Sequence, residues 1–445
     1  MRDEKSAQQI LSSVLAVASK VAPKAEVGAH LTSRRSANTR FARGEVTSTG
    51  DVEEDIVSVE LALGRRHASS STNQTDPSSL RALVERLARL AQVAPEDPEW
   101  LPYLGPQKYV KAASAHDVAT AALGAKARAD AIGEALRAGE AKSLEMSGFY
   151  QHSSGSLASA TSAGLRAYHP STRVELTVTA RLADGHGSGW AGACSHRVAD
   201  LNPVELAKVA ADKAVLSSHP RRLEPGRYTV VLEPAAVGEL LAFLTNSLGA
   251  RPADEGRSFF ARKGGTRLGE KLFADGITLR SDPTSPALPS APFDREGHRL
   301  EPITWVENGK LSALAYSRFW AAKQGKVPTG HHTSYLLEGG DATREGLLTG
   351  VKRGVLITRF WYTRWVDPQS MLITGLTRDG VFLIEDGKLA GPVNNFRFNE
   401  SPVTMLANAD ALTKETVRVP GGQSPLRVPA LRTHGFNLAS VSDAI

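Results

Sequence analysis

Cysteine is almost absent from this 445-residue sequence, which contains Cys194 alone. A single cysteine excludes a disulfide within the chain, and this is typical of proteins from a reducing compartment. Long hydrophobic runs are missing too, because no stretch approaches the ~18 apolar residues of a membrane span. The first residues mix acids with bases and lack the apolar core of a signal peptide. We therefore expect a soluble, cytoplasmic protein that contacts no membrane.

A strong excess of one charge is lacking as well. The net charge is +6, aromatic residues make up 6% of the chain, and its lysines and arginines are spread out. Nucleic-acid binders usually gather basic residues into a stripe with aromatics between them, and we find no helix-turn-helix or zinc-finger pattern. We predict no direct contact with nucleic acid. The densest basic groups are pairs, which we interpret as solvated surface: Arg34-Arg35, Arg65-Arg66 and Arg221-Arg222.

What the chain does have is an ordinary globular composition, with 41% hydrophobic and 22% charged residues. At ~100–200 residues per domain, its length predicts two domains or three. The clearest local signal near the start is Asp76-Pro77, a good N-cap residue followed by proline at the first helical position. The expected elements are a helix at 5–22, strands at 25–32, 36–41, 45–48 and 55–64, a polar loop at 67–77 and a helix at 77–93.

The middle of the chain begins with a proline-rich stretch, 94–109, that we expect to be extended. A helix is predicted at about 114–137, and antiparallel strands separated by Gly and Ser turns follow it. Asn202-Pro203 supplies an N-cap and a first helical residue for another helix. The charged, proline-containing segment Arg221–Gly226 then marks the best candidate boundary between domains.

Beyond this boundary, segments with a strand pattern dominate. The run 227–233 reads as a buried strand and 234–247 as a helix, while Asn308-Gly309 and Asp386-Gly387 are strong hairpin turn signals. We predict an α+β fold in two domains. The first is a mixed α/β-type domain with helices on a sheet, at 1–222, which includes a central region of strands and helices at about 114–217. The second is a β-rich domain of mostly antiparallel strands, at 223–445.

Local motifs for chemistry are weak. The sequence has no His-Glu-x-x-His helix, and the adjacent His331 and His332 would point in different directions. Asp294 and His298 have a ligand-like spacing, but they lie among prolines and glycines in an expected loop. Cys194 has no evident catalytic partner, so we interpret it as a buried thiol. No Gly-x-Ser-x-Gly nucleophile motif and no glycine-rich phosphate loop is present.

Four segments in order resemble the TldD/PmbA family, also called the modulator of DNA gyrase family. Their order and spacing fit nearly the whole chain, although no single motif is decisive. The segments are TRFARGEVTSTGDVEEDIVSVELALGRRHASSSTNQTDPSSLRALVERLARLA at 39–91, GRYTVVLEPAAVGELLAFL at 226–244, PTGHHTSYLLEGGD at 328–341 and FLIEDGKLAGPVNNFRFNES at 382–401.

The resemblance also indicates which branch of the family this chain is similar to. Zinc-bearing members carry a His-Glu-x-x-x-His pattern on the helix that opens the C-terminal domain, with a cysteine near the C-terminus as third ligand. Here Pro234 stands at the first histidine, Ala235 at the catalytic glutamate and Glu239 at the second histidine, and no cysteine follows residue 194. One carboxylate does not make a zinc site. The chain thus resembles the metal-less PmbA/TldE-type subunit, for which we expect no catalytic residue and no metal ligand of its own.

Two functions follow from the resemblance. In the favoured one, the chain is the metal-less subunit of a TldD/TldE-type metallopeptidase complex that acts on unfolded or extended peptides, with zinc on a TldD-type partner subunit. In the alternative, it is a homodimeric peptide- or ligand-binding protein without peptidase activity. His331 and His332 are weak candidates for the substrate side, although packing of the neighbouring 335–337 also explains why that segment is recognisable. The aromatic group around Trp361 and Trp365 is either an interface anchor or core.

Overall fold

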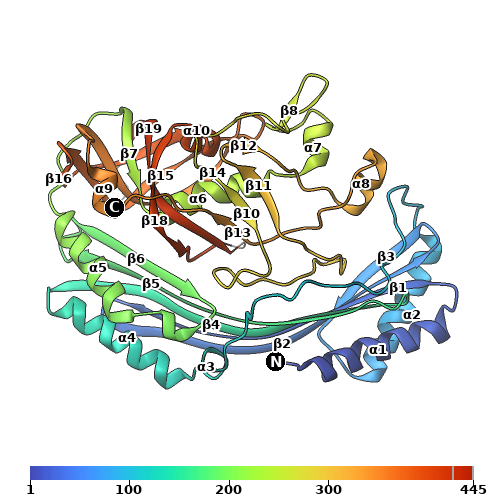
Figure 1. The fold of residues 1–445 in the computed structure, drawn as a ribbon. Helices are drawn as coiled ribbons and strands as arrows, with labels where there is room; N and C mark the ends of the chain where they lie inside the picture. The colour runs from blue at the N-terminus through green and yellow to red at the C-terminus, as the bar shows by residue number, and fades with distance from the viewer. Residues whose placement is uncertain (423–424, 443–445) are drawn as a thin grey trace.

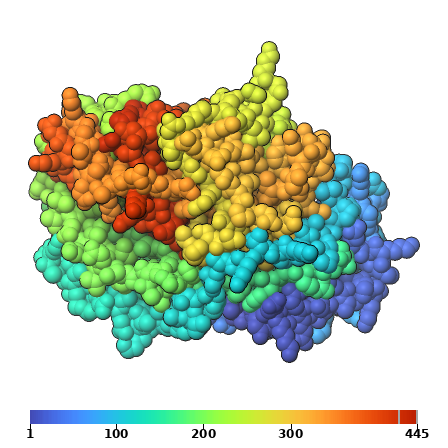
Figure 2. Space-filling model, in the orientation of Figure 1, coloured from blue at the N-terminus to red at the C-terminus, as the bar shows by residue number. Residues whose placement is uncertain are grey.

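The computed structural model describes residues 1–422 and 425–442. Two large sheets dominate it, one of six strands and one of eleven. In Figure 1 the six-stranded sheet is a long curved layer, with helices on its outer face and the second half of the chain on its inner face. The space-filling view shows the two halves packed against each other along this boundary (Figure 2). Helices and mostly antiparallel strands together confirm the predicted α+β fold.

The six-stranded sheet has the order β3-β2-β1-β4-β5-β6, and each neighbouring pair is antiparallel. Four of its strands have 17 to 19 residues, and in Figure 1 they run from one end of the molecule to the other. Side chains alternate between its two faces, so apolar residues at every second position meet the helices. The strands are β1 (Glu26–Ala42), β2 (Glu45–Leu63), β3 (Arg66–Thr72), β4 (Leu144–Thr161), β5 (Arg166–Leu182) and β6 (Ser188–Ser195).

The outer face of this sheet is covered by two groups of helices, one at each end (Figure 1). Each group buries an apolar stripe at helical spacing, such as Leu80, Leu83 and Leu87, so the sheet has a separate core under each group. Asp76 caps its helix as predicted, because its side chain accepts hydrogen bonds from the N–H groups of two serines. The helices are α1 (Glu4–Val21) and α2 (Pro77–Val93) at one end, and α3 (Val118–Ala121), α4 (Ala125–Glu140) and α5 (Pro203–Leu216) at the other.

Four predictions for this half are wrong. The polar loop expected at 67–77 is largely the strand β3, which pairs with β2 as the edge of the sheet and has no fully buried residue, so its polar sequence is tolerated. The two strands expected at 25–32 and 36–41 are the single strand β1, and the two expected at 45–48 and 55–64 are the single strand β2. The helix expected at about 114–137 starts later and is interrupted between α3 and α4. The proline-rich stretch 94–109 has almost no regular structure, as predicted.

The eleven-stranded sheet partly closes on itself. β7 pairs with β14 on one side and with β19 on the other, so the strands β7-β14-β15-β17-β19 form a ring. Two pairs, β7 with β14 and β13 with β19, are parallel, and the remaining pairs are antiparallel. Its strands are β7 (Gly226–Leu232), β10 (Leu279–Ser281), β11 (Ile303–Glu307), β12 (Lys310–Leu311), β13 (Tyr335–Leu337), β14 (Arg353–Asp367), β15 (Leu372–Glu385), β16 (Lys388–Pro392), β17 (Asn395–Glu400), β18 (Ala409–Arg418) and β19 (Leu426–Ser442).

Both predicted hairpin turns are confirmed. Asn308 and Gly309 connect β11 to β12 with φ values of 46° and 78°. Asp386 and Gly387 connect β15 to β16 with φ values of 46° and 76°. Positive φ at both central positions is what a two-residue hairpin of this kind requires, and Asn-Gly and Asp-Gly tolerate it.

Short elements complete this half of the chain. They are α6 (Pro234–Asn246), α7 (Ala250–Asp254), α8 (Arg318–Gln324), α9 (Arg344–Leu348), α10 (Pro402–Ala407), and the small hairpin of β8 (Ala261–Arg262) and β9 (Gly265–Thr266). Across the described part of the chain, no helix combines the length and apolar character needed to cross a membrane.

Candidate functional site

The helix α6 is the element that matches the zinc helix of the family by resemblance. It begins directly after β7, with Glu233 between them and Pro234 at a first-turn position that suits proline. Its apolar side chains, such as Val237, Leu240 and Leu244, are fully buried in the core of the second half of the chain. Pro234 and Ala235 are half-buried in the first turn, while Glu239 is exposed.

Glu239 is held in place by strand β14. Its carboxylate accepts a hydrogen bond from the Thr363 hydroxyl at 3.2 Å. Burial by the surrounding protein raises the pKa of Glu239 even though its side chain retains solvent access, and Thr363 and Arg359 oppose this shift only in part. A carboxylate already bonded to a threonine and near an arginine is poorly placed to act alone as a metal ligand.

The space beside α6 is filled by the segment that precedes β19. The Val419 side chain packs on Gly238 so closely that a Cβ atom there would lie 2.8 Å from a Val419 methyl carbon. The same segment crosses to the first sheet, where the Gly421 N–H donates to Glu175 at 3.0 Å and Cys194 Sγ donates to the Val419 carbonyl at 3.2 Å. This segment therefore joins α6 to strands β5 and β6.

A partly buried ion pair lies next to Glu239, whose carboxylate interacts with the charge of Arg359. The Asp379 carboxylate is 1% exposed and accepts hydrogen bonds from Nε and Nη2 of Arg359, at 2.9 and 2.8 Å. The Arg359 guanidinium also lies 5.0 Å from the ring centre of Trp190, on β6, so it links the two sheets. Arg378 lies over the Trp361 ring at 4.3 Å. Sequence reasoning missed this group, because its members come from three strands and share no local motif.

The histidines singled out from the sequence lie elsewhere, and the Asp294 carboxylate accepts the backbone N–H groups of both His298 and His331. His332 is buried edge-on to Trp305, with ring centres 5.5 Å apart, and burial lowers its pKa to about 4. His331 is exposed, and its backbone N–H donates a hydrogen bond to the Asp294 carboxylate at 3.0 Å. Their side chains thus differ in surroundings, as expected for adjacent residues. The pair remains a weak candidate for the substrate side.

Cys194 is buried, as its interpretation as a structural thiol requires. Burial raises its pKa, although Arg173 and Arg418 act in the opposite direction. A thiol with a raised pKa is a poor nucleophile.

The donor set around α6 does not fit a zinc ion. Within residues 1–422 and 425–442 no group of three or more His, Cys, Asp or Glu side chains is arranged to hold a metal. Proline and alanine have no side-chain lone pair to offer at the first two family positions. We therefore assign no catalytic step to a metal held by this chain.

The aromatic group of the β14–β15 hairpin is only partly core. Trp365 packs edge-on against Phe243 of α6, with ring centres 4.8 Å apart. Trp361 and Tyr362 are 42% and 63% exposed, so they lie at the surface. Tyr362 has a φ of 55°, which is unusual for a residue with a large side chain.

Comparison with known proteins gives consistent results. Three models of the PmbA/TldA metallopeptidase family match: domain 1 at residues 31–91, the central domain at 109–217 and the C-terminal domain at 225–440. The metalloprotease PmbA of Escherichia coli O157:H7 is 23% identical over 431 residues, which are 93% of this chain and 90% of that protein. A metalloprotease of Methanothermobacter thermautotrophicus is 28% identical over 263 residues, and the match spans only 56% of its length.

Solved structures share the fold. TldE from Thermococcus kodakarensis superposes with a TM-score of 0.88 at 16% identity, over 97% of this chain and 100% of that one. A protein of Thermotoga maritima, described as a candidate modulator of a DNA gyrase, superposes with a TM-score of 0.84 at 19% identity, again over 97% and 100%. Since the family models together cover most of the sequence, the chain belongs to the TldD/PmbA family of metallopeptidase-related proteins.

Proposed function

We propose that this chain is the metal-less subunit of a TldD/TldE-type peptidase complex in the cytoplasm. A TldD-type partner supplies the zinc, and the complex cleaves unfolded or extended peptides. The observation that carries the proposal is α6, where Pro234, Ala235 and Glu239 stand at the family's zinc-helix positions and Glu239 is bonded to Thr363.

The relatives support the reaction class and the type of subunit. PmbA of Escherichia coli O157:H7 is called a metalloprotease, and the Thermococcus structure is called TldE. In a peptidase of this kind, a zinc-bound water attacks the peptide carbonyl with a glutamate as base. The partner would supply both groups, because this chain has neither at the matching positions. Its own part would be to complete the complex and help enclose the peptide.

Extended peptides are bound well by strand addition to a sheet edge, since main-chain hydrogen bonds need little sequence preference. The described chain offers such an edge in β2. Its segment 45–56 pairs with β1 on one side, whereas β3 covers only the later residues Val57–Leu63 on the other. Most of this segment is exposed.

The test measures zinc content and peptide cleavage by the purified chain, by the TldD-type protein of the same genome, and by their mixture. We expect less than stoichiometric zinc and no cleavage from this chain alone, and cleavage on mixing above that of the partner alone. Stoichiometric zinc with cleavage by the lone chain would refute the proposal. A stable homodimer that binds peptides, and that the partner neither joins nor activates, would establish the alternative of a non-catalytic binding protein.

A further inference from the structure

The hairpin of β8 and β9 projects from the body of the second half of the chain (Figures 1 and 2). It has two residues in each strand, and the turn between them is Lys263-Gly264, where Gly264 has a φ of 80°. Arg262 and Lys263 on this hairpin are exposed. The tip of this hairpin, residues 262–265, is exposed, so it contributes little to the core and is accessible to another molecule.

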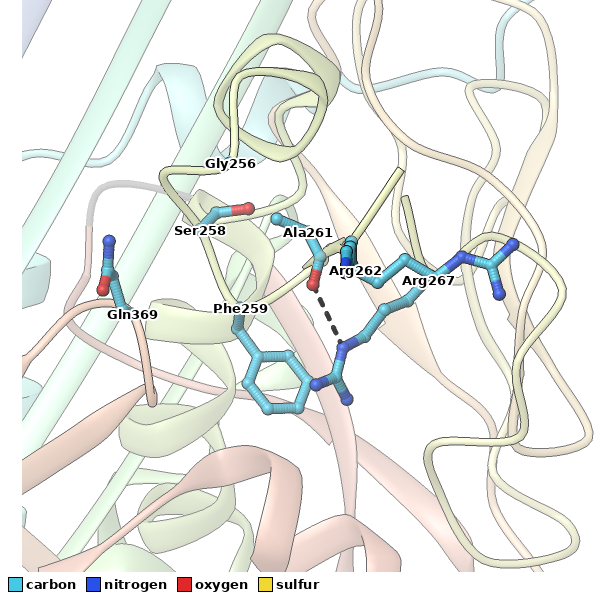
Figure 3. A pocket seen from close by; sticks show the side chains of 8 residues that line it. Gly256, Ser258, Phe259, Ala261, Arg262, Arg267 and Gln369 are labelled. Atoms are coloured by element: carbon cyan, nitrogen blue, oxygen red, sulfur yellow. Dashed lines mark hydrogen bonds between the residues drawn. The ribbon is translucent and has the colours of Figure 1, made fainter. Parts of the chain in front are cut away.

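A surface cleft of about 450 Å³ lies at the base of this hairpin. Figure 3 shows its lining, in which Gln369 from the tip of the β14–β15 hairpin joins residues of the 256–267 segment. Two stretches more than one hundred residues apart thus form one cleft. The lining residues are Gly256, Ser258, Phe259, Ala261, Arg262, Lys263, Arg267 and Gln369.

The cleft presents hydrogen-bond donors. Arg267 lies over the Phe259 ring at 4.6 Å, and its Nε donates to the Ala261 carbonyl at 3.4 Å, which fixes the guanidinium in the cleft (Figure 3). The Ser258 hydroxyl oxygen is buried and finds no hydrogen-bond partner within the described residues. Buried hydroxyls are normally bonded, so this one has capacity for a group that enters the cleft.

The charge of the cleft has one sign. Its lining includes Arg262, Lys263 and Arg267 and no acidic residue. Only Arg262 forms an ion pair among the described residues, with Glu270 just outside the lining at 3.2 Å. Lys263 and Arg267 form no ion pair within the described residues, and their positive charge attracts carboxylates and repels cationic groups.

From these contacts we propose that the cleft is a docking site for an acidic segment of the TldD-type partner subunit, an inference that rests on the proposed function. Carboxylate side chains of that segment would bind Lys263 and Arg267, and its apolar atoms would lie on Phe259. A protein partner fits better than a single small anion, because the strand β14 that leads to Gln369 also carries the exposed side chains of Tyr362, at 63%, and Val366, at 53%, which only a larger partner would cover. Aromatic and arginine side chains together are typical of residues that dominate binding between proteins.

A second copy of this chain fits the aromatic part of the surface less well. Arg364 lies at the surface of the same hairpin, over the Tyr362 ring at 5.2 Å. Pairing of this face with itself would bring the same cations together on both sides, which disfavours association. An acidic partner removes that repulsion.

The test uses Arg262→Glu/Lys263→Glu, both exposed positions, and measures binding to the TldD-type protein of the same genome by sedimentation or calorimetry. The control is Lys5→Glu/Lys24→Glu, which makes the same change in net charge at exposed positions near the N-terminus. We expect the dissociation constant to rise at least about tenfold in the first variant and to stay within about twofold in the control. Wild-type binding should also weaken with salt more steeply than binding by the first variant.

The possible failures are distinguishable. If wild type and partner do not associate at all, both this inference and the proposed function fail. If they associate and the two charge variants bind equally well, only the docking site is refuted. The inference is also refuted if the first variant loses affinity for inorganic phosphate or duplex DNA while its affinity for the partner is unchanged. Thermal unfolding of all variants confirms that the fold is retained.

Discussion

Thr363 donates a hydrogen bond to Glu239, and this contact joins strand β14 to α6, the helix that by resemblance matches the family's zinc helix. We predict that Glu239→Gln leaves partner-supported peptide cleavage within about twofold of wild type. Glutamine keeps an oxygen that accepts the Thr363 bond, and no chemistry is assigned to the charge. Cleavage by the mixed complex is the measurement. A loss of a hundredfold would show that the carboxylate takes part in the reaction.

The same variant tests the surroundings of this carboxyl. Because burial raises the pKa of Glu239 in the folded chain above its ordinary value of 4.5, its ionised form opposes folding at neutral pH. We expect Glu239→Gln to be at least as stable as wild type at pH 7 in urea unfolding. The difference should close as the pH falls toward 4.5, where wild type becomes protonated.

Local signals made much of the fold predictable. Asp76 accepts backbone N–H bonds within its own first helical turn, and Asn308-Gly309 sets its turn through its own φ values, so both could be recognised from neighbouring residues. Strand β3 could not, because its polar sequence resembles a loop and only its pairing with β2 makes it a strand. The break between α3 and α4 could not be recognised from neighbouring residues either.

From the sequence, the candidate site could be predicted only at the positions that the family pattern covers. Pro234, Ala235 and Glu239 follow from a match along one helix. The partner of Glu239 lies 124 residues away on β14, and the pair of Arg359 with Asp379 depends on an irregular register between two strands. Contacts of this kind are set by tertiary packing, so no spacing in the sequence indicates them.

Gly238 is predicted to be intolerant of a side chain. In Gly238→Ala the new Cβ would lie 2.8 and 2.9 Å from the two Val419 methyl carbons, and such overpacking costs about 1–3 kcal/mol. A Val419→Ala background removes both methyl contacts and leaves only the Cβ of residue 419, at 3.2 Å, so most of the clash is relieved. Alanine is favoured over glycine in a helix by about 1 kcal/mol. Urea unfolding of both single variants and the double variant measures the coupling. If Gly238→Ala lowered the free energy of unfolding equally in the wild-type and Val419→Ala backgrounds, Val419 would not be the residue that excludes a side chain at position 238.

Glu175 is predicted to hold the segment that links the two sheets. It is 5% exposed, accepts the Gly421 N–H at 3.0 Å and pairs with Arg173 at 2.6 Å. Glu175→Ala leaves both donors without this acceptor and should lower the free energy of unfolding by about 3 kcal/mol. Hydrogen exchange at 417–422 should become faster.

A matched control for this variant is Glu53→Ala, in the same sheet. Glu53 forms an exposed ion pair with Arg35 at 3.8 Å, and such pairs contribute less than about 1 kcal/mol. We expect the control to change the free energy of unfolding by less than this amount. Hydrogen exchange at 417–422 should stay unchanged. Equal effects of the two variants would show that Glu175 is not a specific link.

Three buried histidines should make the protein less stable in acid. Burial lowers the pKa of His152, His169 and His332 to about 4 in each case, against an ordinary value of 6.5. Below pH 6.5 the unfolded chain takes up protons that the folded chain accepts only near pH 4, so stability is complete above 6.5 and is lost as the pH falls through this window. By pH 5 each histidine should lower the free energy of unfolding by about 2 kcal/mol.

Urea unfolding at pH 7 and pH 5 measures the loss for wild type, for His332→Gln and for the exposed control His331→Gln. The His332 variant should lose less stability than wild type between these pH values, while equal losses in all three proteins would show that His332 is not buried in its neutral form.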